Sequence, residues 1–207
     1  MAEWIAKNDY LSQTEMENNA FLFYSYMKNK GWTDNAISGA LGCIQHESSI
    51  NPGIWEGLVV SPERGFGLVQ WTPSTNFTKW ADSKGYSHTD GNAQCEWINT
   101  QTGLGQWIET TSYPLSWEEF KSSTEPPGYL GYAWESNFER PGILYDPTDA
   151  ANYWYEFLSG KPPEPGPGHG GLEKLIPDLD IDAIIQYGMV AKIKGGNKNG
   201  IYYPAGY

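Results

Sequence analysis

Hydrophobic positions recur at helical spacing through most of the chain, and capping patterns mark where the periodic segments begin. Ser12 and Glu15 form a capping-box pattern ahead of an apolar series that ends at Gly31. A second apolar series starts near Thr33 and stops before Pro52, because proline disfavours helical backbone in the residue that precedes it. The pattern therefore predicts two helices near the start of the chain.

The same signals predict further helices after a loop region. Residues 51–71 are rich in Gly and Pro and predict a loop that leads into a short strand or hairpin. Thr72 reads as a helix cap with Pro73 at the first helical position, and Gly85 as the end of that helix. Later helices are expected at 92–101, 117–123, around 128–138 and 147–158. The fold class predicted is therefore mainly α (α+β, lysozyme-like) with a small β-hairpin.

The composition changes abruptly after the last predicted helix. Residues 159–171 are dominated by Pro and Gly, as in a linker. Residues 172–207 are too few for an independent core, and their pattern predicts a hairpin. We therefore expect a helical domain over residues 1–158, a linker, and a short C-terminal segment.

Charge and hydropathy exclude several classes of partner. The 207 residues include 13 basic and 25 acidic side chains, which give a net charge of -12. Nucleic-acid binding needs clustered Lys and Arg, and no basic stripe is present, so no nucleic-acid partner is expected. No run of about 18 apolar residues is present, so no membrane partner is expected. The N-terminus lacks a basic region followed by an apolar segment, so no secretory signal peptide is expected.

Aromatic residues make up 15% of the chain, with 10 Trp and 14 Tyr. Their flat faces suit ligands such as sugars, although packing in the core explains any single ring more simply. Cys43 and Cys95 are too few for a disulfide framework, and they form no C-x-x-C pair for zinc or redox chemistry. Two buried thiols are therefore expected.

Glu47 is the carboxyl group whose position most suggests chemistry. On a helical wheel it lies on the same side as Ala40 and Cys43, at the C-terminal end of its helix. Loss of water and the negative end of the helix dipole both favour the protonated acid, which can donate to a glycosidic oxygen. A structural carboxylate paired with Arg64, Arg140 or a backbone amide is the alternative, and position alone leaves both open.

Two motifs around Glu47 carry a family resemblance. They are LGCIQHESSINPGIW, residues 41–55, and GFGLVQWTP, residues 65–73. Together they resemble the lysozyme-like domain of phage tail-associated peptidoglycan hydrolases, particularly the tail-knob muramidases of short-tailed Bacillus phages. Goose-type lysozymes and lytic transglycosylases share a looser pattern. In these families, Glu-Ser at a helix end is followed by Pro and then by a Gly-Leu-Met-Gln-like strand.

The counterparts in this sequence are Glu47-Ser48, Pro52 and the stretch from Gly67 to Gln70. The resemblance extends over roughly residues 8–160, since ERP at 139–141 and YWY at 153–155 also look like that phage family. It implies that Glu47 is the catalytic acid of an N-acetylmuramidase, which cleaves the β-1,4 bond between N-acetylmuramic acid and N-acetylglucosamine.

The resemblance also places Gln70 and Trp71 on a strand that would line the sugar cleft. Gln70 can offer a donor and an acceptor to an N-acetyl group, and Trp71 can stack on a pyranose face. The alternatives are a hydrogen bond that anchors the loop and packing in the core. The candidates for a second carboxylate are Glu56, Glu63 and Glu139, and their spacing does not choose among them. Glu139 could equally hold Arg140 or a helix end.

Two other enzyme classes fit the sequence less well. His46-Glu47 begins like the zinc motif H-E-x-x-H, but Ile50 stands where the second histidine is needed, so no metal site is expected. A thiol peptidase would need Cys43 activated by His46 or His88, and no local signature of that class surrounds the cysteine.

The expected partner is bacterial peptidoglycan, with other phage tail proteins or a following domain as further partners, and no cofactor is implied. The expected location is the virion tail, acting from outside on the host cell wall. Phage relatives often continue past such a linker into a metallopeptidase domain. This chain stops at Tyr207, so it is expected to be a fragment or to have a tail that docks on a partner. A lytic transglycosylase and a non-catalytic wall-binding or tail-structural module of the same fold remain as alternatives.

Overall fold

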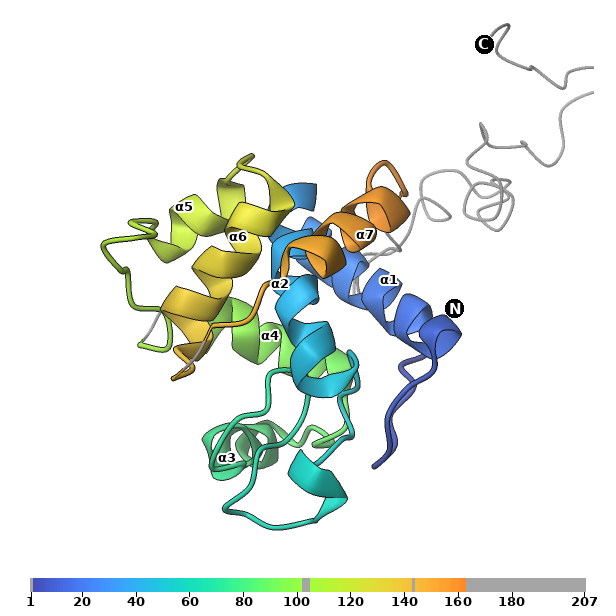
Figure 1. The fold of residues 1–207 in the computed structure, drawn as a ribbon. Coiled ribbons are helices and arrows are strands. Elements are labelled where there is room, and N and C mark those ends of the chain that lie inside the picture. The colour runs from blue at the N-terminus through green and yellow to red at the C-terminus, as the bar shows by residue number, and fades with distance from the viewer. Residues whose placement is uncertain (1, 102–104, 143, 163–207) are drawn as a thin grey trace, which may run out of the picture.

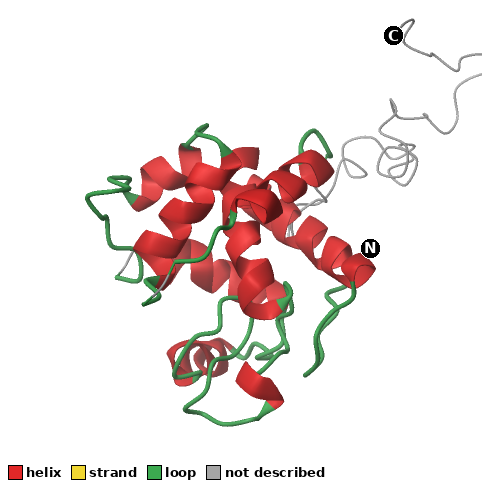
Figure 2. Ribbon diagram, viewed as in Figure 1, coloured by secondary structure: helices red, strands yellow, loops and turns green. Residues whose placement is uncertain are grey.

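The computed structural model describes residues 2–101, 105–142 and 144–162, and within these ranges the chain is mainly helical (Figure 2). Its helices in chain order are α1 (Gln13–Asn29), α2 (Asp34–Ser48), the 3-10 turn η1 (Glu56–Leu58), α3 (Thr75–Lys84), α4 (Gly91–Gln101), α5 (Trp117–Ser122), α6 (Pro127–Trp134), the π-helical η3 (Glu135–Glu139) and α7 (Thr148–Leu158). None of the helices in the described ranges combines the length and the apolar character that crossing a bilayer requires.

The first two predicted helices are confirmed together with their caps. The Ser12 hydroxyl accepts a hydrogen bond from the backbone N–H of Glu15, whose carboxylate accepts from the N–H of Ser12 at 2.8 Å. Thr33 caps α2 in the same way, through the N–H of Ala36 at 3.1 Å. The helix ends at Ser49, where the backbone turns left-handed with φ 55°. Local capping chemistry therefore fixes both boundaries as the sequence predicts.

The predicted start of the third helix is wrong. The Thr72 hydroxyl donates to the carbonyl of Gln70 at 3.0 Å and caps no helical N–H. The Thr72–Pro73 peptide bond is cis, and α3 begins only at Thr75. Gly85, with φ 73°, ends the helix as expected.

The prediction of a short strand or hairpin at the end of residues 51–71 is also wrong. In the described part of the chain, the pairing is a single antiparallel bridge between Trp55 and Phe66, without a strand on either side. The backbone is left-handed at Leu58, Gly67 and Gln70, with φ of 59°, 79° and 49°, and these residues interrupt any extended run. The hairpin predicted within residues 172–207 lies outside the described residues.

The core is built around α2, which packs against both α6 and α7 (Figure 1). Two glycines allow this close approach. A Cβ at Gly39 would lie 2.8 Å from the Cβ of Leu130, and one at Gly42 would lie 2.9 Å from the backbone nitrogen of Ala151. At Gly39 and Gly42, where α6 and α7 cross α2, there is therefore no room for a side chain.

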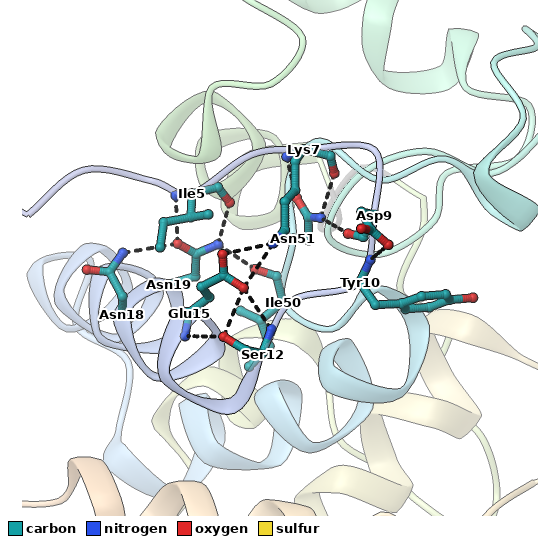
Figure 3. Close-up of polar contacts among 10 residues, drawn as sticks. All are labelled: Ile5, Lys7, Asp9, Tyr10, Ser12, Glu15, Asn18, Asn19, Ile50 and Asn51. Atoms are coloured by element: carbon teal, nitrogen blue, oxygen red, sulfur yellow. Dashed lines mark hydrogen bonds and ion pairs between the residues drawn. The ribbon is translucent and has the colours of Figure 1, made fainter.

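The N-terminal strap, residues 2–12, has no helix or strand but is held firmly (Figure 3). Asn19 is fully buried, and its side chain pairs with both the N–H and the carbonyl of Ile5, at 2.9 and 2.8 Å. Asn51, also fully buried, donates to the carbonyl of Lys7 at 2.7 Å. Side-chain amides thus satisfy backbone groups that a sheet would otherwise pair.

Candidate active site

Glu47 lies in the last turn of α2 and is partly buried. Within the described residues, no hydrogen bond or ion pair reaches its carboxyl group. The two arginines that could neutralise it are used elsewhere, since Arg64 donates to the carbonyl of Glu56 and Arg140 to the carbonyls of Gln106 and Asn137. Burial raises the pKa of Glu47 above its ordinary value of 4.5; the adjacent His46 acts against this shift, and the nearby carboxyl of Glu135 adds to it.

Ser48 explains why a serine follows the glutamate in the motif. Its side chain is fully enclosed, and the hydroxyl oxygen lies 2.8 Å from the carbonyl oxygen of Leu68 and 3.0 Å from that of Ile44. The buried Gln94 holds the same loop, because its side chain accepts from the N–H of Leu68 at 2.8 Å and donates to the carbonyl of Pro52 at 2.7 Å. These hydrogen bonds therefore hold the end of α2, the loop at Pro52 and the loop at Leu68 in fixed positions relative to one another.

A pocket of about 390 Å³ opens beside Glu47. Four segments form its wall: the N-terminal strap, the last turn of α2, the loop that runs into η1 together with the start of η1, and the loop on either side of the bridge residue Phe66. The lining residues are Tyr10, Glu47, Ile54, Trp55, Glu56, Gly57, Gly65, Gln70 and Thr72. The carboxyl group with the raised pKa thus borders a cavity of the size that small ligands occupy.

The two predicted substrate-binding residues lie in different environments. Gln70 lines the pocket, but its Nε2 donates to the carbonyls of Gly67 at 2.9 Å and Ile54 at 3.3 Å, as in the loop-anchoring alternative. Trp71 is only 7% exposed and stacks on Phe77, with ring centroids 4.8 Å apart. Its ring belongs to the core and does not line the pocket.

The three candidates for a second carboxylate are also separated by the structure. Glu56 lines the same pocket as Glu47, is exposed, and accepts a hydrogen bond from the N–H of Gly65 at 3.0 Å. Glu63 is exposed and is not among the lining residues. Glu139 lies in η3, and its carboxylate accepts from the indole Nε1 of Trp134 at 2.7 Å. Only Glu56 therefore shares the pocket wall with Glu47.

Glu139 belongs to what we call the carboxyl cluster, Glu47, Glu135 and Glu139. Burial raises the pKa of Glu139 to about 8, with a further contribution from Glu47. Glu135 is fully buried; one oxygen accepts from the N–H of Tyr145 at 2.9 Å, while the other has no hydrogen-bond partner in the described part of the chain. Burial raises its pKa as well. Like charges that share a dry site favour protonation, so Glu135 favours the acid form of Glu47, and Glu47 favours the acid form of Glu139.

Sequence reasoning missed Glu135. It lies four residues before Glu139 and, like Glu139, is in the π-helical segment that continues α6. Such segments are rare and often occur at functional sites. The spacing of two glutamates ahead of Arg140-Pro141 was the available signal, but nothing local shows that the first of them is buried.

The thiol and metal alternatives find little support. Cys43 is fully buried, its sulfur contacts the carbonyl of Gly131 at 3.3 Å, and burial raises its pKa, whereas a nucleophilic cysteine needs a lowered one. His46 stacks on Tyr145 with ring centroids 4.0 Å apart. Among the described residues, no three His, Cys, Asp or Glu side chains are grouped so that they could bind a metal ion.

The model of the phage tail lysozyme family matches residues 18–158, which contain α2, the pocket loops and the carboxyl cluster. This chain belongs to the phage tail lysozyme family. It is a lysozyme-like phage tail protein and therefore virion-associated. The family match ends at the last residue of α7 and excludes the N-terminal strap.

The chain is also similar to a protein of a Bacillus phage. Morphogenesis protein 1 of Bacillus phage B103 is 39% identical over 185 residues, which cover 87% of this chain and 48% of that protein. The chain thus spans about half the length of this curated relative.

Proposed function

We propose that this member of the phage tail lysozyme family is an N-acetylmuramidase, which cleaves the β-1,4 bond between N-acetylmuramic acid and N-acetylglucosamine as a phage penetrates the host cell wall. The observation that carries the proposal is Glu47. It is a partly buried carboxyl group with a raised pKa and no hydrogen bond or ion pair in the described residues, and it borders a pocket of about 390 Å³. A group in that state holds a proton that it can give away.

In the proposed reaction, Glu47 donates its proton to the bridging oxygen while the bond from that oxygen to C1 of muramic acid breaks. The product that leaves is N-acetylglucosamine with a free 4-hydroxyl. Water adds to C1, and a carboxylate accepts the water's proton. Glu56 is the candidate for this second role, since it lines the same pocket and its exposed carboxylate is oriented by the N–H of Gly65.

Mass spectrometry of the fragments released from purified cell walls tests the reaction. A muramidase releases fragments that end in reducing muramic acid. The Glu47→Gln variant keeps the shape of the side chain but loses the proton, and we expect its rate to fall by roughly 100-fold or more. Glu63→Gln is the matched control, because this loop carboxylate is exposed and does not line the pocket.

Three results would contradict the proposal. Anhydro-muramic ends would identify a lytic transglycosylase, and the absence of any release by the wild-type protein would indicate a non-catalytic module. Equal activity of Glu47→Gln and Glu63→Gln would show that Glu47 has no special role in the reaction. A selective loss in Glu56→Gln would in addition assign the second carboxylate.

A further inference from the structure

Tyr10 places an aromatic ring on the pocket wall from outside the region that the family model matches. Its side chain is 62% exposed, and it lines the pocket that Glu47 borders. In the described part of the chain, its hydroxyl group makes no hydrogen bond and its ring stacks on no other ring. Single exposed rings are common on protein surfaces, and what distinguishes Tyr10 is its place on the pocket wall and the anchoring of its backbone.

The segment that carries Tyr10 is anchored just before it. The buried Asn51 donates to the carbonyls of Lys7 and Asp9, both at 2.7 Å, and Lys7 forms an ion pair with Glu15 at 2.8 Å. Figure 3 shows the ring of Tyr10 extending away from these contacts. The polar network therefore fixes the backbone and leaves the aromatic face free.

The strap is also bonded to another segment that lines the same pocket. The side chain of Asn8 accepts from the N–H of Trp55 at 3.0 Å and donates to the carbonyl of Leu58 at 3.0 Å. Trp55 is the other aromatic residue that lines the pocket, and its ring packs against Phe66 with centroids 4.6 Å apart. The strap and the loop into η1 thus bring two aromatic side chains to one cavity, and the fixed backbone of the strap reduces the entropy that is lost when a ligand binds there.

We propose that Tyr10 is a substrate-binding residue, whose ring stacks on the apolar face of an N-acetylhexosamine unit next to the bond that is cleaved. This inference rests on the proposed function of the pocket. The N-terminal strap, which lies outside the matched residues 18–158, thereby supplies part of the saccharide site. The ring provides the contact, and the hydroxyl group is not required.

Binding of chitotetraose, a β-1,4 tetramer of N-acetylglucosamine, tests the inference without turnover. Isothermal titration calorimetry is done on the full chain with Glu47→Gln in every variant. We expect Tyr10→Ala to weaken binding by about 3- to 10-fold, the range typical of one aromatic contact, and Tyr10→Phe to bind as the parent does. The matched control is Tyr86→Ala, since Tyr86 is 38% exposed and does not line the pocket. Unchanged thermal midpoints show that the strap stays in place.

Equal affinity of Tyr10→Ala and the parent would overturn the inference, as would a parent that does not bind the tetramer. A loss of affinity in Tyr10→Phe as large as in Tyr10→Ala would overturn the stacking contact. The proposed function fails separately: a parent that binds the tetramer through Tyr10, in a protein whose wild type releases no muropeptides, would retain the binding role and remove the catalytic one.

Discussion

Replacing Glu139 by glutamine should change how the stability of the protein depends on pH. Burial and the neighbouring Glu47 raise the pKa of Glu139 from 4.5 to about 8. Between these values, the folded protein holds a proton that the unfolded chain has released, so the free energy of unfolding falls as pH rises. Glutamine cannot ionise, and its amide oxygen can still accept from the Trp134 indole, which Glu139 binds at 2.7 Å. The variant should therefore lose this pH-dependent part only.

The magnitude follows from the same pKa. Each pH unit in this window costs the wild type at most about 1.4 kcal/mol, which gives an upper limit of roughly 5 kcal/mol at pH 8. Partial exposure and coupling to Glu47 reduce this, and we expect a gain in the variant of about 1–3 kcal/mol at pH 8. Near pH 4, where the wild-type carboxyl is protonated in both states, the two proteins should differ by less than about 1 kcal/mol.

Urea denaturation of the wild type and Glu139→Gln at several pH values between 4 and 8.5 measures this difference. Because other titrating groups are common to both proteins, their contributions largely cancel. A difference that stays constant over the whole range would refute the argument, and so would a variant that becomes less stable than the wild type as pH rises. Either result would mean that Glu139 is ionised and accommodated in the folded protein.

Two further substitutions test the packing and the strap. Asn51→Ala removes the donor to the carbonyls of Lys7 and Asp9 and the acceptor for the N–H of Gly53, so it should lower the free energy of unfolding by about 2–4 kcal/mol and speed amide exchange in the strap. Gly42→Ala places a methyl group 2.9 Å from the backbone nitrogen of Ala151 and should cost about 1–3 kcal/mol in urea denaturation, through displacement of α7. Unchanged stability in either variant would show that the contact is absent.

Features that depend on neighbours in sequence were predictable. The capping box at Ser12 forms as expected, because a hydroxyl and a glutamate three residues later can satisfy each other's backbone N–H without help from the rest of the fold. The position of Glu47 on the buried side of α2 followed from helical periodicity alone. Its role as the acid came from the family resemblance and stays a prediction.

Features that depend on distant contacts were not predictable. The hairpin is absent from the described residues, because left-handed residues and side chains such as Gln94 pair the loop backbone in place of a second strand. The burial of Trp71 depends on its stacking with Phe77, which no local pattern specifies. Glu135 escaped notice because its burial results from the packing around η3. The sequence suggested three candidates for the second carboxylate. Glu56 differs from the other two because the folded loops place it on the wall of the pocket that Glu47 borders.

The central claim is that Glu47 keeps its proton where an ordinary glutamate would have lost it. Carboxyl 13C NMR of the folded protein measures this directly, with the Glu47→Gln variant to assign the signal. We expect a midpoint above the ordinary value of 4.5, because the group is partly buried beside another carboxyl. A midpoint at or below 4.5 would contradict the account, since Glu47 would then be ionised near neutral pH and would have no proton to give.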